Sequence, residues 1–133
     1  PPGSKLDVIN ILGMVEPIFD VAQFRITKGT ASRYDHVSGG SGKAVHVHFC
    51  SNCGTKSHLT FERWPDRLGV YAGTFDDPGW FSFSPQNSKF IFTDSAVRGA
   101  MVPPGFPSYP QHAATADGTP LTPEISDTVR HFP

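Results

Sequence analysis

Hydrophobic and polar residues alternate with a period of two through the middle of the chain, a pattern typical of half-buried β-strands. Residues 43–50 show it most clearly. Valine and phenylalanine at positions 45, 47 and 49 fall on one face of the predicted strand, whereas His46 and His48 share the other face with Cys50. We therefore expect the first face to pack into the core and the second to present imidazoles beside a thiol.

Shorter apolar or alternating runs predict further strands over residues 6–12, 15–19, 31–36, 55–61, 68–72 and 89–93. A turn with three glycines at residues 38–42 predicts a hairpin. Pro17 is expected to restrict its strand to a sheet edge or a bend. Helical patterns are brief: one turn capped by Asp20, and a short helix over residues 123–129. The chain is therefore predicted to be all-β.

The composition supports this fold class. The 133 residues include 13 glycines, 13 prolines and 11 phenylalanines, which suits short strands joined by many turns. We expect a single domain over residues 1–133, with a cloning remnant or disorder at residues 1–5 and an irregular tail wrapped over the sheet at residues 102–133.

Charge and hydropathy argue against two classes of partner. The net charge is −1 and no basic stripe follows the chain, so we expect no nucleic-acid partner. No apolar run approaches the roughly 20 residues that span a bilayer, and the beginning of the chain lacks the pattern of a signal peptide. We therefore expect no membrane contact, a cytoplasmic location and a small-molecule substrate, and a homodimer stays open.

The chain has two cysteines, Cys50 and Cys53, in a Cys-x-x-Cys-Gly turn that brings both sulfurs to one point. Zinc prefers four nitrogen or sulfur ligands, so the turn supplies half of a site. His46, His48 and His58 are candidates for the missing ligands because they lie on the neighbouring strands. The alternatives are a relic turn without metal and a redox-active pair.

The same histidines are candidate catalytic residues. Imidazole titrates near neutral pH, so His46, His48 and His58 could transfer protons in a pocket. Ordinary polar residues on a solvated strand face would give the same pattern.

Three other residues are candidates for substrate binding. Tyr71 and Trp80 could line an apolar pocket, and Arg63 could bind a substrate carboxylate. A place in the core for the two aromatic residues, and a solvated loop for Arg63, are the competing interpretations.

Three separated segments occur in the order and at the spacing of a known family: Phe-Cys-Ser-Asn-Cys-Gly-Thr at residues 49–55, Gly-Thr-Phe-Asp-Asp-Pro at residues 73–78, and the earlier spacing of Asp20, Phe24 and Gly29. Over residues 15–92 the chain resembles the glutathione-dependent formaldehyde-activating enzyme family, also called the CENP-V/GFA domain. The resemblance implies an all-β, Mss4-like fold of small packed antiparallel sheets. It also implies a carbon–sulfur lyase activity that adds glutathione to formaldehyde.

The resemblance further implies zinc. Family members carry a structural zinc, held by an early Cys-x-Cys pair and a later Cys-x-x-Cys pair, and a catalytic zinc held by a three-cysteine cluster. Cys50 and Cys53 match the later structural pair, and the other cysteines have no counterpart. Either the chain is a truncated form or residues 6–12 replace the missing elements. We expect at most one zinc, in a structural role, and glutathione as co-substrate only if the family reaction is kept.

Three functions remain open. The first is a divergent enzyme on this scaffold, which acts on a small organic molecule by histidine acid–base chemistry rather than through the catalytic zinc. The second is a binding or scaffold module without catalysis. The third is a glutathione-dependent zinc lyase of which this chain is an incomplete part. We favour the first.

Overall fold

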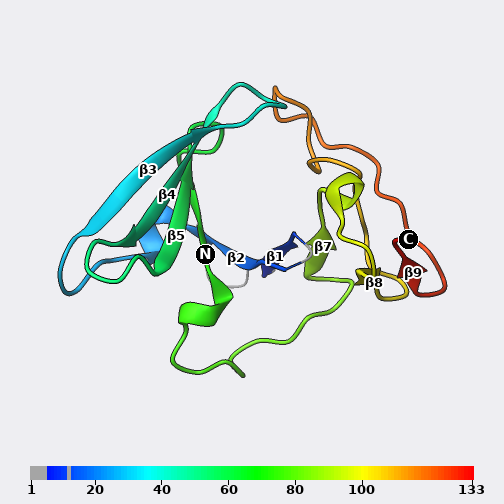
Figure 1. Ribbon diagram of the computed structural model, residues 1–133, viewed down its shortest axis with the longest axis horizontal. Helices are drawn as coiled ribbons and strands as arrows, with labels where there is room; N and C mark the ends of the chain where they lie inside the picture. Colours follow the sequence, from blue (N-terminus) through cyan, green and yellow to red (C-terminus); the bar gives the residue numbers. More distant parts are fainter. Residues whose placement is uncertain (1–5, 12) are drawn as a thin grey trace.

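The structure is a computed structural model that describes residues 6–11 and 13–133. Seven strands form one sheet in the order β3-β4-β5-β6-β2-β1-β7, and two short strands form a second (Figure 1). The strands are β1 (Asp7–Asn10), β2 (Val15–Asp20), β3 (Ala31–Val37), β4 (Ala44–Cys50), β5 (Lys56–Phe61), β6 (Arg67–Val70), β7 (Ser88–Phe90), β8 (Met101–Val102) and β9 (Arg130–His131).

Helical structure in the described residues is limited to three 3-10 turns: η1 (Val21–Gln23), η2 (Ala72–Thr74) and η3 (Thr93–Ser95). The all-β prediction is therefore confirmed, and so is the helical turn that follows Asp20. No described helix has the length and apolarity to span a lipid bilayer. Of the predicted segments, residues 1–5 and Leu12 lie outside the described residues.

The sheet is not purely antiparallel, because β1 pairs with β7 in parallel. All other neighbours in the large sheet are antiparallel, including the predicted hairpin of β3 and β4. Its turn is closed by hydrogen bonds from the Ser38 N–H to the Lys43 carbonyl (3.0 Å) and from the Gly42 N–H to the Ser38 carbonyl (2.8 Å). Gly42 adopts a φ of +70°, which glycine tolerates at little cost.

Pro17 does not lie at a sheet edge, because β2 is an interior strand between β6 and β1. Val8, the partner of Pro17, donates its N–H to Asn87 on the β7 side, so the Val8–Pro17 pair exchanges no hydrogen bond. The nitrogen of Pro17 consequently faces β6, which pairs with β2 only from Ile18 onward. A proline is tolerated inside the sheet because no ladder bond needs its missing N–H.

The two faces of the large sheet have different coverings. One face carries buried residues such as Val8, Leu68 and Val70, and the aromatic residues Phe75 and Trp80 pack over it through Phe19. The other face carries Ile9, Ile18, Leu59 and Val45, and it borders a cavity. The predicted alternation of β4 is confirmed, because Val45 and His46 fall on opposite faces.

The C-terminal tail first extends the sheet and then returns across the cavity. Ser108 forms a parallel bridge to Phe90 of β7 and an antiparallel bridge to Glu124. These bridges keep residue 124 extended, so the predicted helix over residues 123–129 is wrong. Between the bridges, residues 113–121 form a turn closed by the Ala114–Pro120 bridge, and Figure 1 shows this turn beside the β3–β4 turn.

Candidate functional site

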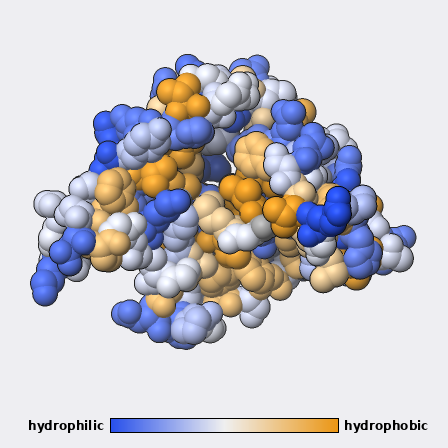
Figure 2. Space-filling model, viewed as in Figure 1, coloured by the Kyte–Doolittle hydropathy of each residue, from blue (hydrophilic) through white to orange (hydrophobic). Residues whose placement is uncertain are grey.

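A cavity of about 430 Å³ lies on the sheet face that carries Ile9, Ile18 and Leu59. Its wall is formed by six neighbouring strands of the sheet, β4, β5, β6, β2, β1 and β7. Residues from segments 38–43 and 109–120 complete the lining. Figure 2 shows a hollow with apolar side chains on both sides. Small-molecule sites typically occupy 300–1,000 Å³. Its polar and aromatic lining comprises Asp7, Glu16, Ser38, Ser41, Lys43, Phe61, Arg63, Trp64, Arg67, Lys89, Phe92, Tyr109 and His112.

Glu16 places a buried carboxyl in the wall of this cavity. Its residue is 3% exposed, and its Oε1 has no hydrogen-bond partner. The carboxyl lies over Gly69 on β6, where a Cβ atom would overlap it, so only glycine leaves the room that this rotamer needs. Burial, and next the charge of Asp7, raise the pKa of Glu16 to about 8. Glu16 is therefore mainly protonated at neutral pH.

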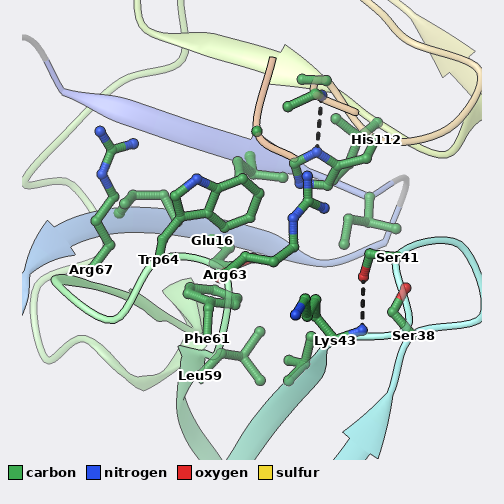
Figure 3. Close-up of a pocket in the computed structure, with 18 of the residues that line it drawn as sticks. Glu16, Ser38, Ser41, Lys43, Leu59, Phe61, Arg63, Trp64, Arg67 and His112 are labelled. Atoms are coloured by element: carbon green, nitrogen blue, oxygen red, sulfur yellow. Dashed lines mark hydrogen bonds between the residues drawn. The ribbon is translucent and has the colours of Figure 1, made fainter. Parts of the chain in front are cut away.

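Trp64 contacts both Arg63 and His112 at the cavity, and Figure 3 shows the three side chains close together. The guanidinium carbon of Arg63 lies 4.2 Å from the centroid of the Trp64 ring, and the Trp64 and His112 ring centroids are 5.1 Å apart. Arg63 also donates a hydrogen bond to the backbone oxygen of Thr115. This contact joins the β5–β6 connection to the returning tail and fixes the guanidinium plane.

His112 is held neutral in a single tautomer. Burial, followed by the charges of Arg63 and Lys89, lowers the pKa of His112 to about 4. The backbone N–H of Ala114 donates to Nδ1 of His112 over 3.0 Å, which leaves the ring proton on Nε2. Phe92 packs edge-on against the ring, in a left-handed backbone conformation with a φ of 58°. His112 can thus present a fixed N–H donor.

Positive charge predominates in the cavity lining. Four basic side chains line it, against two acidic side chains, and one of these two, Glu16, is mainly protonated at neutral pH. Lys89 pairs with Asp7 at 3.3 Å, and Lys43 pairs at 3.7 Å with an exposed glutamate outside the lining. Within the described residues, Arg63 and Arg67 have no carboxylate partner. The cavity therefore suits a negatively charged group.

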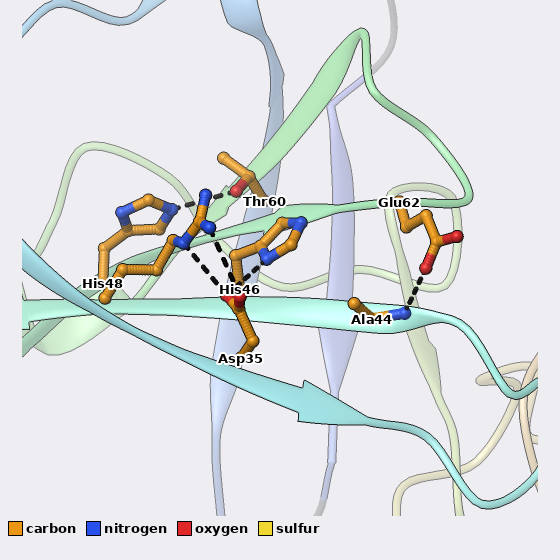
Figure 4. Close-up of polar contacts among 7 residues, drawn as sticks. Asp35, Ala44, His46, His48, Thr60 and Glu62 are labelled. Atoms are coloured by element: carbon orange, nitrogen blue, oxygen red, sulfur yellow. Dashed lines mark hydrogen bonds and ion pairs between the residues drawn. The ribbon is translucent and has the colours of Figure 1, made fainter.

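The three predicted catalytic histidines lie on the opposite face of the sheet and do not line this cavity. His46 Nδ1 is 2.7 Å from a carboxylate oxygen of Asp35, and His48 Nε2 is 2.9 Å from the hydroxyl of Thr60 (Figure 4). The rings of His48 and His58 are stacked with centroids 4.2 Å apart. The sheet therefore brings the three residues together as the alternation predicted.

His58 is the most enclosed of these histidines, at 5% exposed. Its Nδ1 lies 2.9 Å from the hydroxyl of Ser57, and Phe24 packs on the ring at 4.6 Å. Burial, and next the charge of His48, lower the pKa of His58 to about 4, so its ring is neutral at physiological pH. Each of the three imidazoles thus has a polar partner within the protein.

The three predicted substrate-binding residues lie in different places. Arg63 lines the cavity. Tyr71, at the start of η2, lies outside the lining. Burial, and next the charge of Glu16, raise the pKa of Tyr71. Trp80 stacks on Phe19 at 5.9 Å, in the aromatic cluster of the other face.

The Cys-x-x-Cys turn forms as predicted. The Cys50 N–H donates to the Thr55 carbonyl and the Gly54 N–H to the Cys50 carbonyl, both over 2.8 Å. Hydrogen bonds from Thr55, and then from Cys50, lower the pKa of the exposed Cys53 thiol. Among the described residues, no group of three or more histidine, cysteine, aspartate or glutamate side chains is placed to hold a metal ion. Two sulfurs alone do not fit a tetrahedral zinc site.

Sequence reasoning missed Glu16 and His112, which the structure places at the cavity. The one available signal for Glu16 was its position as a single acid in the apolar run of residues 15–19. For His112 the sequence offered no signal, because its surroundings come from Trp64 and Arg63, about 50 residues earlier in the chain.

Comparisons with curated proteins and with solved structures gave no match. A comparison with family patterns gave one, to the glutathione-dependent formaldehyde-activating enzyme family over residues 12–95. The matched region includes Glu16, Arg63 and both cysteines, whereas His112 lies beyond it. Because the match covers more than half of the 133 residues, the chain belongs to the glutathione-dependent formaldehyde-activating enzyme family.

Proposed function

We propose that this protein is a divergent enzyme of its family, and that it makes or breaks a carbon–sulfur bond of a small organic molecule bound in the cavity, with Glu16 as the proton donor. The observation that carries the proposal is the buried Glu16 carboxyl, which has an oxygen without a hydrogen-bond partner in a cavity of small-molecule size. The family supplies the type of bond.

The chemistry assigned to Glu16 follows from its protonation state. When a thiolate sulfur attacks an aldehyde carbon, the π electrons of the C=O bond move to oxygen, which must gain a proton. A carboxylic acid with a pKa of about 8 can donate that proton near neutral pH, and solvent or the next thiol can return one to the carboxylate. In the reverse direction the carboxylate removes the hydroxyl proton while the carbon–sulfur bond breaks.

No step is assigned to zinc, because the described residues supply only the two thiols of Cys50 and Cys53 at the predicted metal turn. These two residues are the ones that would hold a structural zinc if further donors completed the site. Their place at the turn between β4 and β5, outside the cavity lining, favours a role in the fold rather than in the reaction.

The predicted histidine site is the second candidate. The stacked pair of His48 and His58, with His46 nearby, is the observation that favours it. The cavity site has stronger support because a substrate needs an unsatisfied group and room to bind, and each of these histidines already has a partner. A binding module without catalysis would use the same cavity but would not depend on Glu16 for any reaction.

The test is the family reaction itself. Exchange NMR measures how fast glutathione and formaldehyde interconvert with their adduct, for the wild type, Glu16→Gln and the double variant His46→Ala/His48→Ala. We expect the wild type to exceed the uncatalysed rate, Glu16→Gln to lose about 10²-fold or more of that excess, and the double variant to keep it. Loss in the double variant alone would transfer the role to the histidines. A wild-type rate equal to the uncatalysed rate would refute carbon–sulfur lyase activity on this pair.

A further inference from the structure

We propose that the cavity recognises an organic anion, a carboxylate carried on an apolar body, and that Arg63 is the residue that binds the carboxylate. The inference concerns the same cavity as the proposed function and rests on it for the view that the bound molecule is a substrate. It adds the chemical class of that molecule and the residue that selects it.

Unused hydrogen-bonding capacity points to Arg63. Of the buried side-chain polar atoms in the described residues, Oε1 of Glu16 and Nε of Arg63 are those without a partner, and both residues line the cavity. Arg63 uses one terminal nitrogen to bind the Thr115 backbone oxygen. The guanidinium has five N–H donors in a planar fork, so donors remain for a carboxylate.

The position of the guanidinium is fixed before any ligand binds. The Trp64 ring supports one side of the Arg63 plane at 4.2 Å, and the bond to Thr115 sets its direction. A donor held in place loses little conformational entropy on binding, which favours affinity. The neutral acid Glu16 adds no opposing negative charge below its pKa of about 8.

The rest of the cavity lining indicates the chemical character of the rest of the ligand. Away from the charged groups the wall is made of aliphatic and aromatic side chains, among them Ile9, Ile18, Leu59 and Phe61. Burial of an apolar body here contributes roughly 25 cal/mol for each Å² removed from water. These aliphatic and aromatic side chains suit the apolar body of the ligand, and the charged and polar residues of the lining lie elsewhere in the cavity.

The experiment compares three probes that share a phenyl ring and a four-carbon chain and differ in the head group: 4-phenylbutyrate, 4-phenylbutan-1-ol and 4-phenylbutylamine. The chain has two tryptophans, and Trp80 lies outside the cavity, so a Trp80→Phe background leaves Trp64 as the single fluorescent reporter beside Arg63. We expect the carboxylate to bind at least about tenfold more tightly than the alcohol, and the amine more weakly than both.

Variants test whether Arg63 causes the preference for the carboxylate. Arg63→Gln should bring the carboxylate and the alcohol to within about twofold, whereas the matched charge loss Arg98→Gln, at an exposed site outside the cavity, should leave the tenfold ratio unchanged. If Arg63→Gln does not fold, as judged by circular dichroism, Arg63→Lys and Lys43→Gln replace it, and each should lower the ratio. Equal binding of carboxylate and alcohol, or an unchanged ratio in the cavity variants, would overturn the proposal.

Failure here and failure of the proposed function give different results. The probes do not react, and Glu16→Gln exchanges one neutral side chain for another at pH 7, so this variant should keep the anion preference. An intact preference with turnover that does not need Glu16 would refute the proposed function alone. Turnover that depends on Glu16 without any anion preference would refute this inference alone.

Discussion

The substitution Glu16→Gln should make the protein more stable at alkaline pH, which is a direct consequence of the buried acid. In the folded protein the pKa of Glu16 is raised from 4.5 to about 8. Between these two values the unfolded chain has released the proton and the folded protein still holds it. The folded state therefore binds more protons, and the stability of the wild type falls as pH rises through this interval.

The size of the effect follows from the same two values. Each unit of pKa difference corresponds to 1.36 kcal/mol, so the interval from 4.5 to about 8 gives about 5 kcal/mol at most. Domains are stable by about 5–15 kcal/mol, so this is a large share. Glutamine is neutral at every pH and has nearly the same shape, so Glu16→Gln removes the dependence. The amide of the variant still lacks a hydrogen-bond partner in this place. At low pH the free energies of unfolding of the variant and the wild type should therefore differ by no more than about 1–3 kcal/mol.

The measurement is urea unfolding of both proteins at pH 4.5, 6, 7.5 and 9. The free energy of unfolding of Glu16→Gln minus that of the wild type should increase across this series by several kcal/mol. Asp66→Asn, which removes an exposed carboxyl outside the cavity lining, is the control, and its difference should stay within about 0.5 kcal/mol. A difference for Glu16→Gln that stays constant with pH would refute the assignment of a protonated buried acid.

Three further outcomes are expected. Gly69→Ala should displace the Glu16 side chain, because a Cβ overlaps its carboxyl, and unfolding followed against pH should then show a smaller alkaline loss of stability than in the wild type. His112→Gln should reduce the stability lost between pH 6.5 and 4, where unfolded histidine binds a proton and the buried ring does not. Zinc, measured by mass spectrometry after mild chelation, should be below one ion per chain, and one ion that disappears in Cys50→Ser would show that further donors complete the site.

Local patterns were sufficient to predict much of the sheet. The alternation in residues 43–50 gave β4 its two faces, and the glycines at residues 38–42 predicted the hairpin with β3. Each of these features depends on residues close in the sequence. The prediction that Pro17 lies at a sheet edge or a bend was wrong for the same reason. A proline is tolerated inside this sheet because of where β6 begins to pair with β2, which is a long-range contact.

The cavity could not be predicted because its parts meet only through long-range contacts. Glu16 has room for its carboxyl only because Gly69 of another strand lacks a Cβ atom, and Arg63 is fixed by Thr115 from the returning tail. Alternation places a residue on a face of a strand, but it does not say which face borders a cavity and which is covered. The sequence prediction therefore favoured the histidine face, which has the more recognisable residues.

The distribution of unsatisfied groups argues for the cavity as the functional site. A buried carboxyl without a partner costs stability, and an apolar residue could line the same wall. Arg63 presents a second such atom in the same cavity, whereas the imidazoles of the opposite face all have partners. Glu16, the proposed proton donor, and Arg63, the proposed carboxylate-binding residue, line the same cavity, which is the arrangement that the two proposals require.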